Sequence, residues 1–326
     1  MIKVDVFNEL GNQLFIYAYA RALSLEYNEP IVINKSVALM YLIKLNFPQL
    51  MKVSYKLDYF NIVPCRVQNS FIGFIQSIPP VLHMIWYRRK QDDYDFMDSL
   101  FKRVTGKGRH YYADTRFASY FSHAKTTKKT KHVHGAWSSE KYFEKYRETI
   151  RNELRVVTTP SKENQNIIDE MNSCNSVAVH FRKGDFVTIK KIQGLLDICS
   201  TDYYMRGMRY IAKSVPNPVF YIFSNEMQWV HSYMKFEYPV KFIEGNAAHE
   251  DLRLMYNCKH FIISNSTFPW WGSYLSDNPN KIVVTPSVWN KEYPEKGKDI
   301  LRSDMILMNP FDETSHKNLP QKEVKL

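Results

Sequence analysis

The chain has 326 residues, of which 44% are apolar and 24% are charged. Its length exceeds the roughly 100–200 residues of one domain, and its composition is that of a globular protein, so we expect two folded domains and exclude widespread disorder. The formal net charge of +11 favours anionic partners such as nucleotides, nucleic acid or acidic lipid headgroups, without choosing among them.

Cysteine usage and the N-terminal pattern predict a location. The four cysteines are widely spaced and form no C-x-x-C pair, so we expect neither a zinc site nor a disulfide framework, and a reducing compartment fits best. The first residues alternate as a strand does and lack a signal-peptide pattern. We therefore expect a cytoplasmic protein.

One apolar segment raises the question of a membrane. Residues 71–87 are largely apolar and are followed by three basic residues, 88–90. The stretch is shorter than the ~20 residues of a spanning helix and contains Pro79 and Pro80, so we do not expect a span. It either packs inside the protein or lies at the membrane interface, as a peripheral contact on the inner face.

The first part of the chain opens as a β-α-β unit. Hydrophobic periodicity predicts a strand over residues 2–7, a helix over 12–27 and a returning strand over 30–33. Residues 37–130 mix apolar runs with prolines and basic clusters, and we expect only helices and loops inserted in the first domain there. A polar, helix-like segment then reaches Glu153.

The pattern becomes regular after Pro160, where short apolar strands alternate with helical segments. We predict strands over residues 177–181, 219–223, 240–243, 261–264 and 282–285, and helices over 201–214, 226–234, 250–258 and 267–275. Such alternation is typical of an α/β fold with a parallel sheet, in which ligands lie beyond the carboxyl ends of the strands. We expect domains over residues 1–158 and 159–311, followed by a flexible tail over 312–326.

Two of the predicted strands end in side chains that suit a phosphate. The strand 261–264 continues into a run of small polar residues before the next helix: Ser264, Asn265, Ser266 and Thr267. Hydroxyls, an amide and backbone N–H groups at a helix N-terminus can bind a phosphate, although the same residue types also serve as plain N-caps. The two readings are compatible.

The strand 177–181 ends in Arg182, followed by Lys183 and Asp185. A guanidinium forms bidentate contacts with phosphate oxygens and stabilises the charge that grows on a departing diphosphate. The alternative is a structural ion pair between Arg182 and Asp185. Asp185 itself is either a loop-fixing carboxylate or a general base.

Several sequence blocks form a characteristic series along the chain: L-G-N-Q-L-F from Leu10, S-E-K-Y-F from Ser139, H-F-R-K-G-D from His180, D-Y-Y from Asp202, I-F-S from Ile222, and residues 249–275. Taken in this order, the blocks resemble bacterial α-1,2-fucosyltransferases, glycosyltransferase family 11. The resemblance implies two Rossmann-like domains facing across a cleft, the GT-B-type arrangement. It also implies inverting, metal-independent transfer of L-fucose from GDP-L-fucose to the 2-hydroxyl of a galactose residue, in the synthesis of O-antigen or another cell-surface polysaccharide.

The resemblance also implies roles for the domains. The second domain would bind GDP-L-fucose, which is a donor substrate rather than a cofactor. The first domain would lie on the side of the acceptor, a galactose-containing oligosaccharide or lipid-linked glycan. The segment 37–130 carries little of the resemblance, and acceptor specificity could reside there.

Individual residues follow from the matched blocks. Arg182 would contact the diphosphate. Lys183 stands where the family pattern has a second arginine, so it keeps the positive charge but cannot form the bidentate contact of a guanidinium. His180 is either a hydrogen-bonding core residue or a nucleotide contact. Glu226 would contact guanine, although the family's S-D-D reads S-N-E here.

The glycine turn that opens the first predicted helix lies outside the second domain. Gly11, Asn12 and Gln13 form this turn, and the resemblance places them near the donor sugar, the diphosphate or the acceptor. A lone glycine turn without G-x-G-x-x-G does not indicate a dinucleotide site.

Two other motifs are weaker. A D-x-D spacing within residues 92–95 could hold a divalent cation, but it does not follow an apolar strand, so we expect no metal site. Residues 249–253 begin like H-E-x-x-H but end in Arg253, which removes the second zinc ligand and favours an acidic first helical turn.

Two alternative functions stay open. Another nucleotide sugar is compatible with the same fold and phosphate site. A nucleic-acid-binding protein would explain the positive charge, but the sequence shows neither a basic-aromatic platform nor a recognition-helix pattern, so we expect no nucleic-acid partner.

Overall fold

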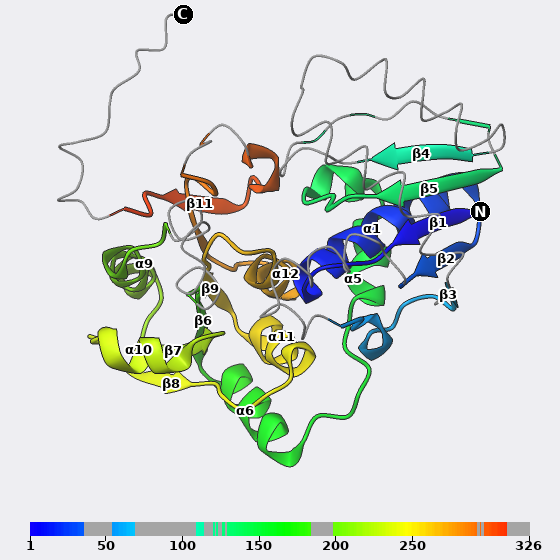
Figure 1. Ribbon diagram of the computed structural model, residues 1–326. Coiled ribbons are helices and arrows are strands. Elements are labelled where there is room, and N and C mark those ends of the chain that lie inside the picture. The colour runs from blue at the N-terminus through cyan, green and yellow to red at the C-terminus, as the bar shows by residue number, and fades with distance from the viewer. Residues whose placement is uncertain are drawn as a thin grey trace, which may run out of the picture. The chain divides into compact units, whose positions relative to one another are not determined.

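The computed structural model describes residues 1–35, 54–68, 109–113, 120, 122, 126–127, 129–183, 198–291, 294 and 297–311 (Figure 1). The chain divides into two units: unit 1 comprises Met1–Thr159 with Lys296–Arg302, and unit 2 comprises Pro160–Glu295 with Ser303–Leu326. The segment Lys296–Arg302 thus belongs to unit 1, whereas the sequence predicts an unbroken second domain over residues 159–311. The predicted segment 71–90 and the tail 312–326 lie outside the described residues.

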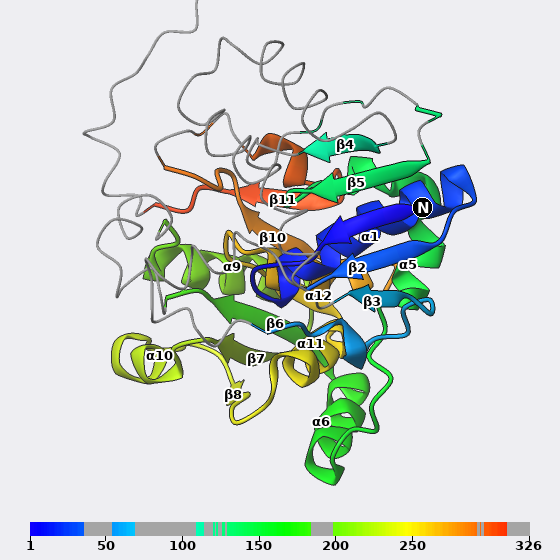
Figure 2. The same ribbon diagram turned by 45° about the vertical axis from the view of Figure 1, so that its right-hand side comes forward.

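Unit 1 is built on a five-stranded sheet in the order β3-β2-β1-β5-β4, in which every pairing is parallel. The strands are β1 (Ile2–Asp5), β2 (Ile31–Asn34), β3 (Arg66–Gln68), β4 (Arg109–Ala113) and β5 (Thr130–His134). Figure 2 shows β5 lying between β1 and β4. The order of the strands along the chain therefore reverses between β1 and β5.

The helix α1 (Leu10–Tyr27) follows β1 and confirms the predicted β-α-β opening. Most of its residues are apolar and buried, as expected of a helix covered on most sides. It ends at Asn28, whose left-handed conformation (φ 51°) lets its backbone N–H bond the carbonyl of Ser24.

The remaining elements of unit 1 are short. They are the 3₁₀ turns η2 (Leu57–Tyr59), η3 (Glu140–Tyr142), η4 (Glu144–Tyr146) and η5 (Lys298–Ile300), and the helix α5 (Arg147–Glu153). The segment Lys296–Arg302 is attached to the rest of unit 1 by contacts of Asp299. The backbone carbonyl of Asp299 accepts the Ser139 hydroxyl at 2.6 Å, and its carboxylate lies 2.5 Å from the Lys141 ammonium.

The expectation of helices and loops alone over residues 37–130 was wrong, because β3, β4 and the first residue of β5 lie there. These strands carry basic and polar residues rather than apolar runs: β3 reads R-V-Q and β5 reads T-K-H-V-H. A strand of three residues or one with buried histidines gives no clear hydrophobic period.

Unit 2 is built on a six-stranded parallel sheet in the order β11-β10-β9-β6-β7-β8. The strands are β6 (Asn175–Phe181), β7 (Pro218–Ser224), β8 (Val240–Phe242), β9 (His260–Ile262), β10 (Val283–Pro286) and β11 (Met305–Met308). The helices are α6 (Lys162–Ser173), α9 (Thr201–Ser214), α10 (Met227–Tyr233), α11 (Ala248–Asn257) and α12 (Thr267–Leu275). The predicted alternation is confirmed; α6 and β11 were not predicted.

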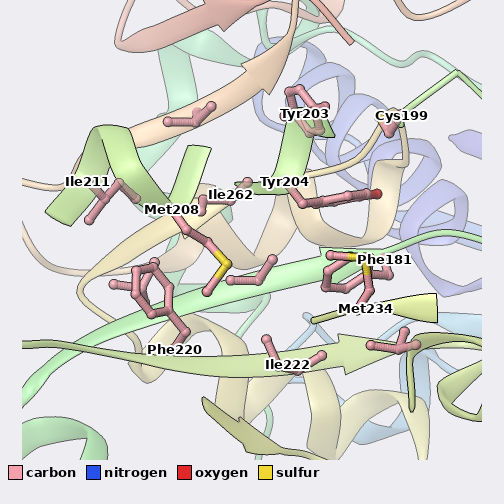
Figure 3. Packing of buried hydrophobic residues seen from close by; sticks show 14 of the residues in the cluster. Phe181, Cys199, Tyr203, Tyr204, Met208, Ile211, Phe220, Ile222, Met234 and Ile262 are labelled. Carbon is pink, nitrogen blue, oxygen red and sulfur yellow. The ribbon is translucent and has the colours of Figure 1, made fainter. Parts of the chain in front are cut away.

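Alternate residues of β6 face different helices. Phe181 packs on Tyr204 of α9, with ring centroids 4.0 Å apart, within a cluster that Figure 3 shows between α9 and the sheet. His180, on the opposite face of the strand, lies against Phe268 of α12. Helices therefore cover both faces of the sheet, and the α/β class with two Rossmann-like units is confirmed.

The helices α11 and α12 pack closely because Gly272 has no side chain. A Cβ atom at Gly272 would lie 2.3 Å from the sulfur of Met255, which is fully buried. Trp270 and Trp271 of α12 are also fully buried, so they contribute to packing.

Changing Gly272 to Ala should lower the free energy of unfolding by about 1–3 kcal/mol, because the added methyl group overpacks this contact. Denaturant titration of the wild type, Gly272→Ala, Met255→Ala and the double variant measures the effect. In the Met255→Ala background, Gly272→Ala should lower the free energy of unfolding far less. If the loss is the same in both backgrounds, the contact with Met255 is not its cause.

Candidate functional site

The polar residues predicted from the second half of the chain gather at one edge of the unit 2 sheet. Because β6, β7 and β9 run parallel, their carboxyl ends meet at the same edge, and Arg182, Asn225 and Ser264 follow these strands closely. The strand order along the chain reverses between β6 and β9. This is the topological switch point at which ligands of doubly wound sheets bind.

His180 and Ser264 join the two strands at the switch point. Nδ1 of His180 lies 2.9 Å from Oγ of Ser264, and both side chains are buried. Burial, together with the nearby charge of Arg182, lowers the pKa of His180 to about 3. The imidazole is therefore neutral near pH 7 and acts as a hydrogen-bonding group rather than a cation.

The loop after β6 is attached to its neighbours through Lys183. The backbone N–H of Lys183 donates to Oδ1 of Asn225 at 3.2 Å. Its buried ammonium donates to the carbonyl of Cys199 at 3.3 Å and lies 4.6 Å from the centre of the Trp229 ring. Lys183 thus directs its charge into the protein, while Arg182 is half-buried beside it. The predicted partner Asp185 lies outside the described residues.

The residues 264–267 form a turn into α12 whose members have different positions. Ser264 is fully buried, and Asn265 donates from Nδ2 to the carbonyl of Trp289 at 3.2 Å. Ser266 is the N-cap of α12 but makes no side-chain capping bond, and both Ser266 and Thr267 are half-buried. Side-chain capping by Ser266 is therefore not observed, and its hydroxyl lies at a helix N-terminus that favours anions.

Glu226 lies at the same edge, after β7. It is the N-cap residue of α10, it is half-buried, and its backbone N–H donates to Oγ of Ser224 at 3.0 Å. The structure thus brings together His180, Arg182, Lys183, Glu226 and the 264–267 turn.

Gly11, Asn12 and Gln13 lie in unit 1, at the start of α1. The Gln13 amide donates to the carbonyls of Asn8 at 2.7 Å and Ser54 at 2.8 Å, and accepts from the backbone N–H of Lys56 at 2.9 Å. Gln13 is buried, so its side chain holds the β1–α1 connection in place.

Sequence reasoning missed Asp251 as a site residue. Its helix α11 follows β8, so the N-terminus of α11 lies at the same edge of the sheet. Within the described residues, Oδ1 of Asp251 is buried without a hydrogen-bond partner. Burial raises the pKa of Asp251 to about 7, and the charge of Glu250 adds to the shift. The signals in the sequence were the expected acidic first turn and the matched block over residues 249–275, which contains this helix.

The loop before Asp251 is supported from α6. Nδ2 of the buried Asn164 donates to Oδ1 of Asn246 at 3.0 Å. Glu250 lies 3.1 Å from the guanidinium of Arg253, so it forms an ion pair where the zinc motif would need a histidine. Among the residues with described positions, no group of three or more His, Cys, Asp or Glu could hold a metal ion. The D-x-D motif lies outside them.

Two α/β units with parallel sheets, one of which has an arginine, hydroxyls and a helix N-terminus at its switch point, define the class of fold: a doubly wound α/β protein with a site that suits a phosphate. The chain belongs to glycosyl transferase family 11, whose family model matches residues 1–309. This confirms the family that the sequence blocks indicated.

Similar proteins include an α-1,2-colitosyltransferase of Escherichia coli, 29% identical over 294 residues that cover 86% of this chain and 89% of the relative. The O-antigen biosynthesis glycosyltransferase WbnK of Escherichia coli is 32% identical over 121 residues, 36% of this chain and 40% of WbnK. A crystal structure of NodZ α-1,6-fucosyltransferase with GDP matches with a TM-score of 0.46 and 14% identity, over 87% of this chain and 94% of NodZ. Among the described residues, no helix has the length and apolar character needed to cross a membrane.

The raised pKa of Asp251 predicts a pH-dependent stability. The folded state holds this proton up to about pH 7, whereas an unfolded aspartate loses it near pH 4, so wild-type stability falls as the pH rises through this window. Asp251→Asn removes the cost of the buried charge. It should stabilise the protein by about 1–2 kcal/mol at pH 8, and the gain should shrink toward pH 4.

Differential scanning calorimetry across this pH range measures the effect. The matched control is Asp169→Asn, which changes an exposed carboxyl group on α6 and should give no such pH-dependent gain. A gain for Asp251→Asn that does not change with pH would contradict the assignment.

Proposed function

We propose that the protein transfers L-fucose from GDP-L-fucose to the 2-hydroxyl of a galactose residue in a glycan acceptor. The observation that carries the proposal is the position of Arg182 beside the 264–267 turn at the switch point of unit 2. Family membership supports sugar transfer, and the name of the α-1,2-colitosyltransferase supports the 1,2-linkage. The sequence blocks that resemble α-1,2-fucosyltransferases support the donor and the galactoside.

The chemistry follows from charge development. As the bond between fucose and the β-phosphate breaks, negative charge grows on the departing GDP and positive charge grows on the sugar ring. The guanidinium of Arg182 can hold two phosphate oxygens, and the first turn of α12 offers backbone N–H groups and the Ser266 and Thr267 hydroxyls. These groups interact more strongly with the transition state than with the bound donor.

His180 supports this arrangement without adding charge. As a neutral, buried imidazole it holds Ser264, and through Ser264 it fixes the start of the turn before α12. Preorganised donors need no rearrangement at the moment of reaction. A direct contact between His180 and the nucleotide stays a prediction, as does the role of Asp185 as general base.

Guanine recognition is assigned to carboxyl groups at the same edge. Guanine presents its N1–H and exocyclic amine side by side, and a carboxylate can accept both. Glu226 is the group predicted from the sequence, and Asp251 offers an oxygen that lacks a partner in the described part of unit 2. A guanine bound to Asp251 would favour its ionised form and lower its pKa.

Transfer of colitose is the second candidate, because the name of a relative that matches 86% of this chain specifies that sugar. Incubation with GDP-L-fucose or with the colitose donor, over a panel of β-galactosides, separates the two by product mass and linkage. Inhibition by GDP but not UDP would support the guanine nucleotide. The location of the chain and any peripheral membrane contact stay predictions.

Replacing Arg182 with Ala should lower kcat for transfer by about 10²–10³-fold while the fold stays intact, because one fixed donor to the developing charge is lost. Arg182→Lys should give an intermediate rate, since it keeps the charge but not the fork. Release of GDP in a coupled assay measures each rate.

The control is Arg209→Ala. Arg209 is solvent-exposed and paired with Glu237 on the surface, so its loss should leave transfer unchanged. If the Arg182→Ala variant melts like wild type and transfers sugar at a near-wild-type rate, the phosphate role of Arg182 is excluded.

A further inference from the structure

Unit 1 contains a cluster of buried polar residues at the carboxyl ends of its central strands. Asp5 ends β1, Asn34 ends β2 and His134 ends β5, and all three are at most 1% exposed. One oxygen of Asp5 accepts from Nδ2 of Asn34 at 2.7 Å. The other lies 2.9 Å from Nδ1 of His134 and 3.0 Å from Nε2 of the buried His132.

The cluster occupies the ligand-binding position of a doubly wound sheet. The strand order of unit 1 reverses between β1 and β5, and the contact between Asp5 and His134 joins the ends of these two strands. Unit 2 has its own buried histidine at the corresponding place, where His180 bonds Ser264 between β6 and β9. Ligands of such sheets lie at the carboxyl ends of the strands at this point.

Keeping the carboxylate of Asp5 ionised inside unit 1 has a cost in folding stability. Burial alone would raise the pKa of Asp5, but His132 and then His134 hold it well below the ordinary value, so the carboxylate is ionised inside unit 1. Replacing a buried charge cluster with well-packed apolar side chains is often neutral or stabilising. Stability therefore gives no reason for this arrangement.

The cluster also has an unmet hydrogen bond. Within the described residues, Nε2 of His134 is buried and has no partner. A buried polar atom without a partner destabilises the folded state, and such atoms in native proteins are few. Nδ1 of His134 faces the Asp5 carboxylate, which can only accept, so Nδ1 carries the proton of this contact. In the neutral form of the ring Nε2 then has a lone pair, and a hydroxyl is a donor that suits it.

We propose that unit 1 binds the reacting hydroxyl of the sugar acceptor at Nε2 of His134, and that this imidazole, oriented by Asp5, takes up the hydroxyl proton. The inference rests on the proposed function. It gives His134 the role of general base, which was one of the two roles that the sequence left open for Asp185.

The proton and electron balance closes within this scheme. The acceptor oxygen forms the new bond to C1 of the donor sugar while the bond from C1 to the phosphate oxygen breaks. The electron pair of that bond leaves with GDP, and the acceptor proton passes to Nε2. The resulting imidazolium is stabilised by the adjacent Asp5 carboxylate, as in other carboxylate–imidazole pairs.

Access to Nε2 requires a local movement. The imidazole is 1% exposed and stacks on Phe7, with ring centroids 5.1 Å apart. Phe7 lies in the connection between β1 and α1, next to Asn8 in a left-handed conformation (φ 63°). The proposal therefore requires Phe7 to move when the acceptor binds, and catalytic hydrogen bonds of free enzymes often tighten only in the complex.

Four variants of the full chain test the role: His134→Gln, His134→Ala, Asp5→Asn and the control His260→Gln. His260 is also buried, and its Nδ1 accepts the backbone N–H of Ile282, but it lies in unit 2 on β9. His134→Gln should lower kcat by about 10²-fold or more and leave GDP affinity unchanged, because glutamine accepts a hydrogen bond but cannot take up the proton. Asp5→Asn should also lower kcat, and His260→Gln should not.

Chemical rescue separates catalysis from structure. Added imidazole should restore part of the rate of His134→Ala in a concentration-dependent way, which a merely structural role would not allow. A folded His134→Gln with near-wild-type kcat, or a folded His134→Ala that imidazole does not rescue, would overturn the proposal.

A measurement on the wild type keeps the proposal testable if the variants do not fold. In protein labelled with ¹⁵N-histidine, saturating methyl β-galactoside should shift the Nε2 resonance of His134; an unchanged resonance would count against it. This readout needs no donor. If the wild type fails to use GDP-L-fucose, the proposed function fails while the resonance still decides the role of His134.

Discussion

The parallel pairing of β6 with β7 on one side and β9 on the other is the constraint on which the candidate site depends. It brings together side chains that are more than forty residues apart in sequence, as the hydrogen bond between His180 and Ser264 shows. The phosphate-binding interpretation of Arg182 and the α12 N-terminus requires this register. A shift by one residue would turn His180 to the face that packs on α9.

Both units keep a buried histidine where their strand order reverses, but the two histidines have different chemistry. His180 bonds a neutral hydroxyl, and burial keeps it uncharged, which suits a group that positions a turn. His134 bonds an ionised carboxylate and has a second nitrogen without a partner in the described residues, which suits a group that accepts a proton. The same place in two similar sheets thus supports a positioning role in one unit and a chemical role in the other.

The sequence predicted the parts of the fold that have strong hydrophobic patterns. The apolar strands of unit 2 and the helix after β1 fall close to their predicted positions, because continuous apolar runs are typical of parallel strands buried on both faces. The strands β3, β4 and β5 escaped prediction because polar residues interrupt their patterns. Of the candidate site, the residues that directly follow apolar strands could be predicted from the sequence, and the structure places them at one edge of the unit 2 sheet. Asp251 and His134 were not, since their importance lies in burial and in a missing partner, which appear only when distant segments pack together.

The return of Lys296–Arg302 to unit 1 has a consequence for the covalent organisation of the molecule. The backbone passes from one unit to the other at residues 159–160, 295–296 and 302–303, so each unit is assembled from two stretches of chain. A single backbone cut near Thr159 would place Asp299 on a different fragment from Ser139 and Lys141, the residues that its backbone and carboxylate contact. The N-terminal half produced alone would lack that closing piece, so these units cannot be exchanged between relatives as simple head and tail modules.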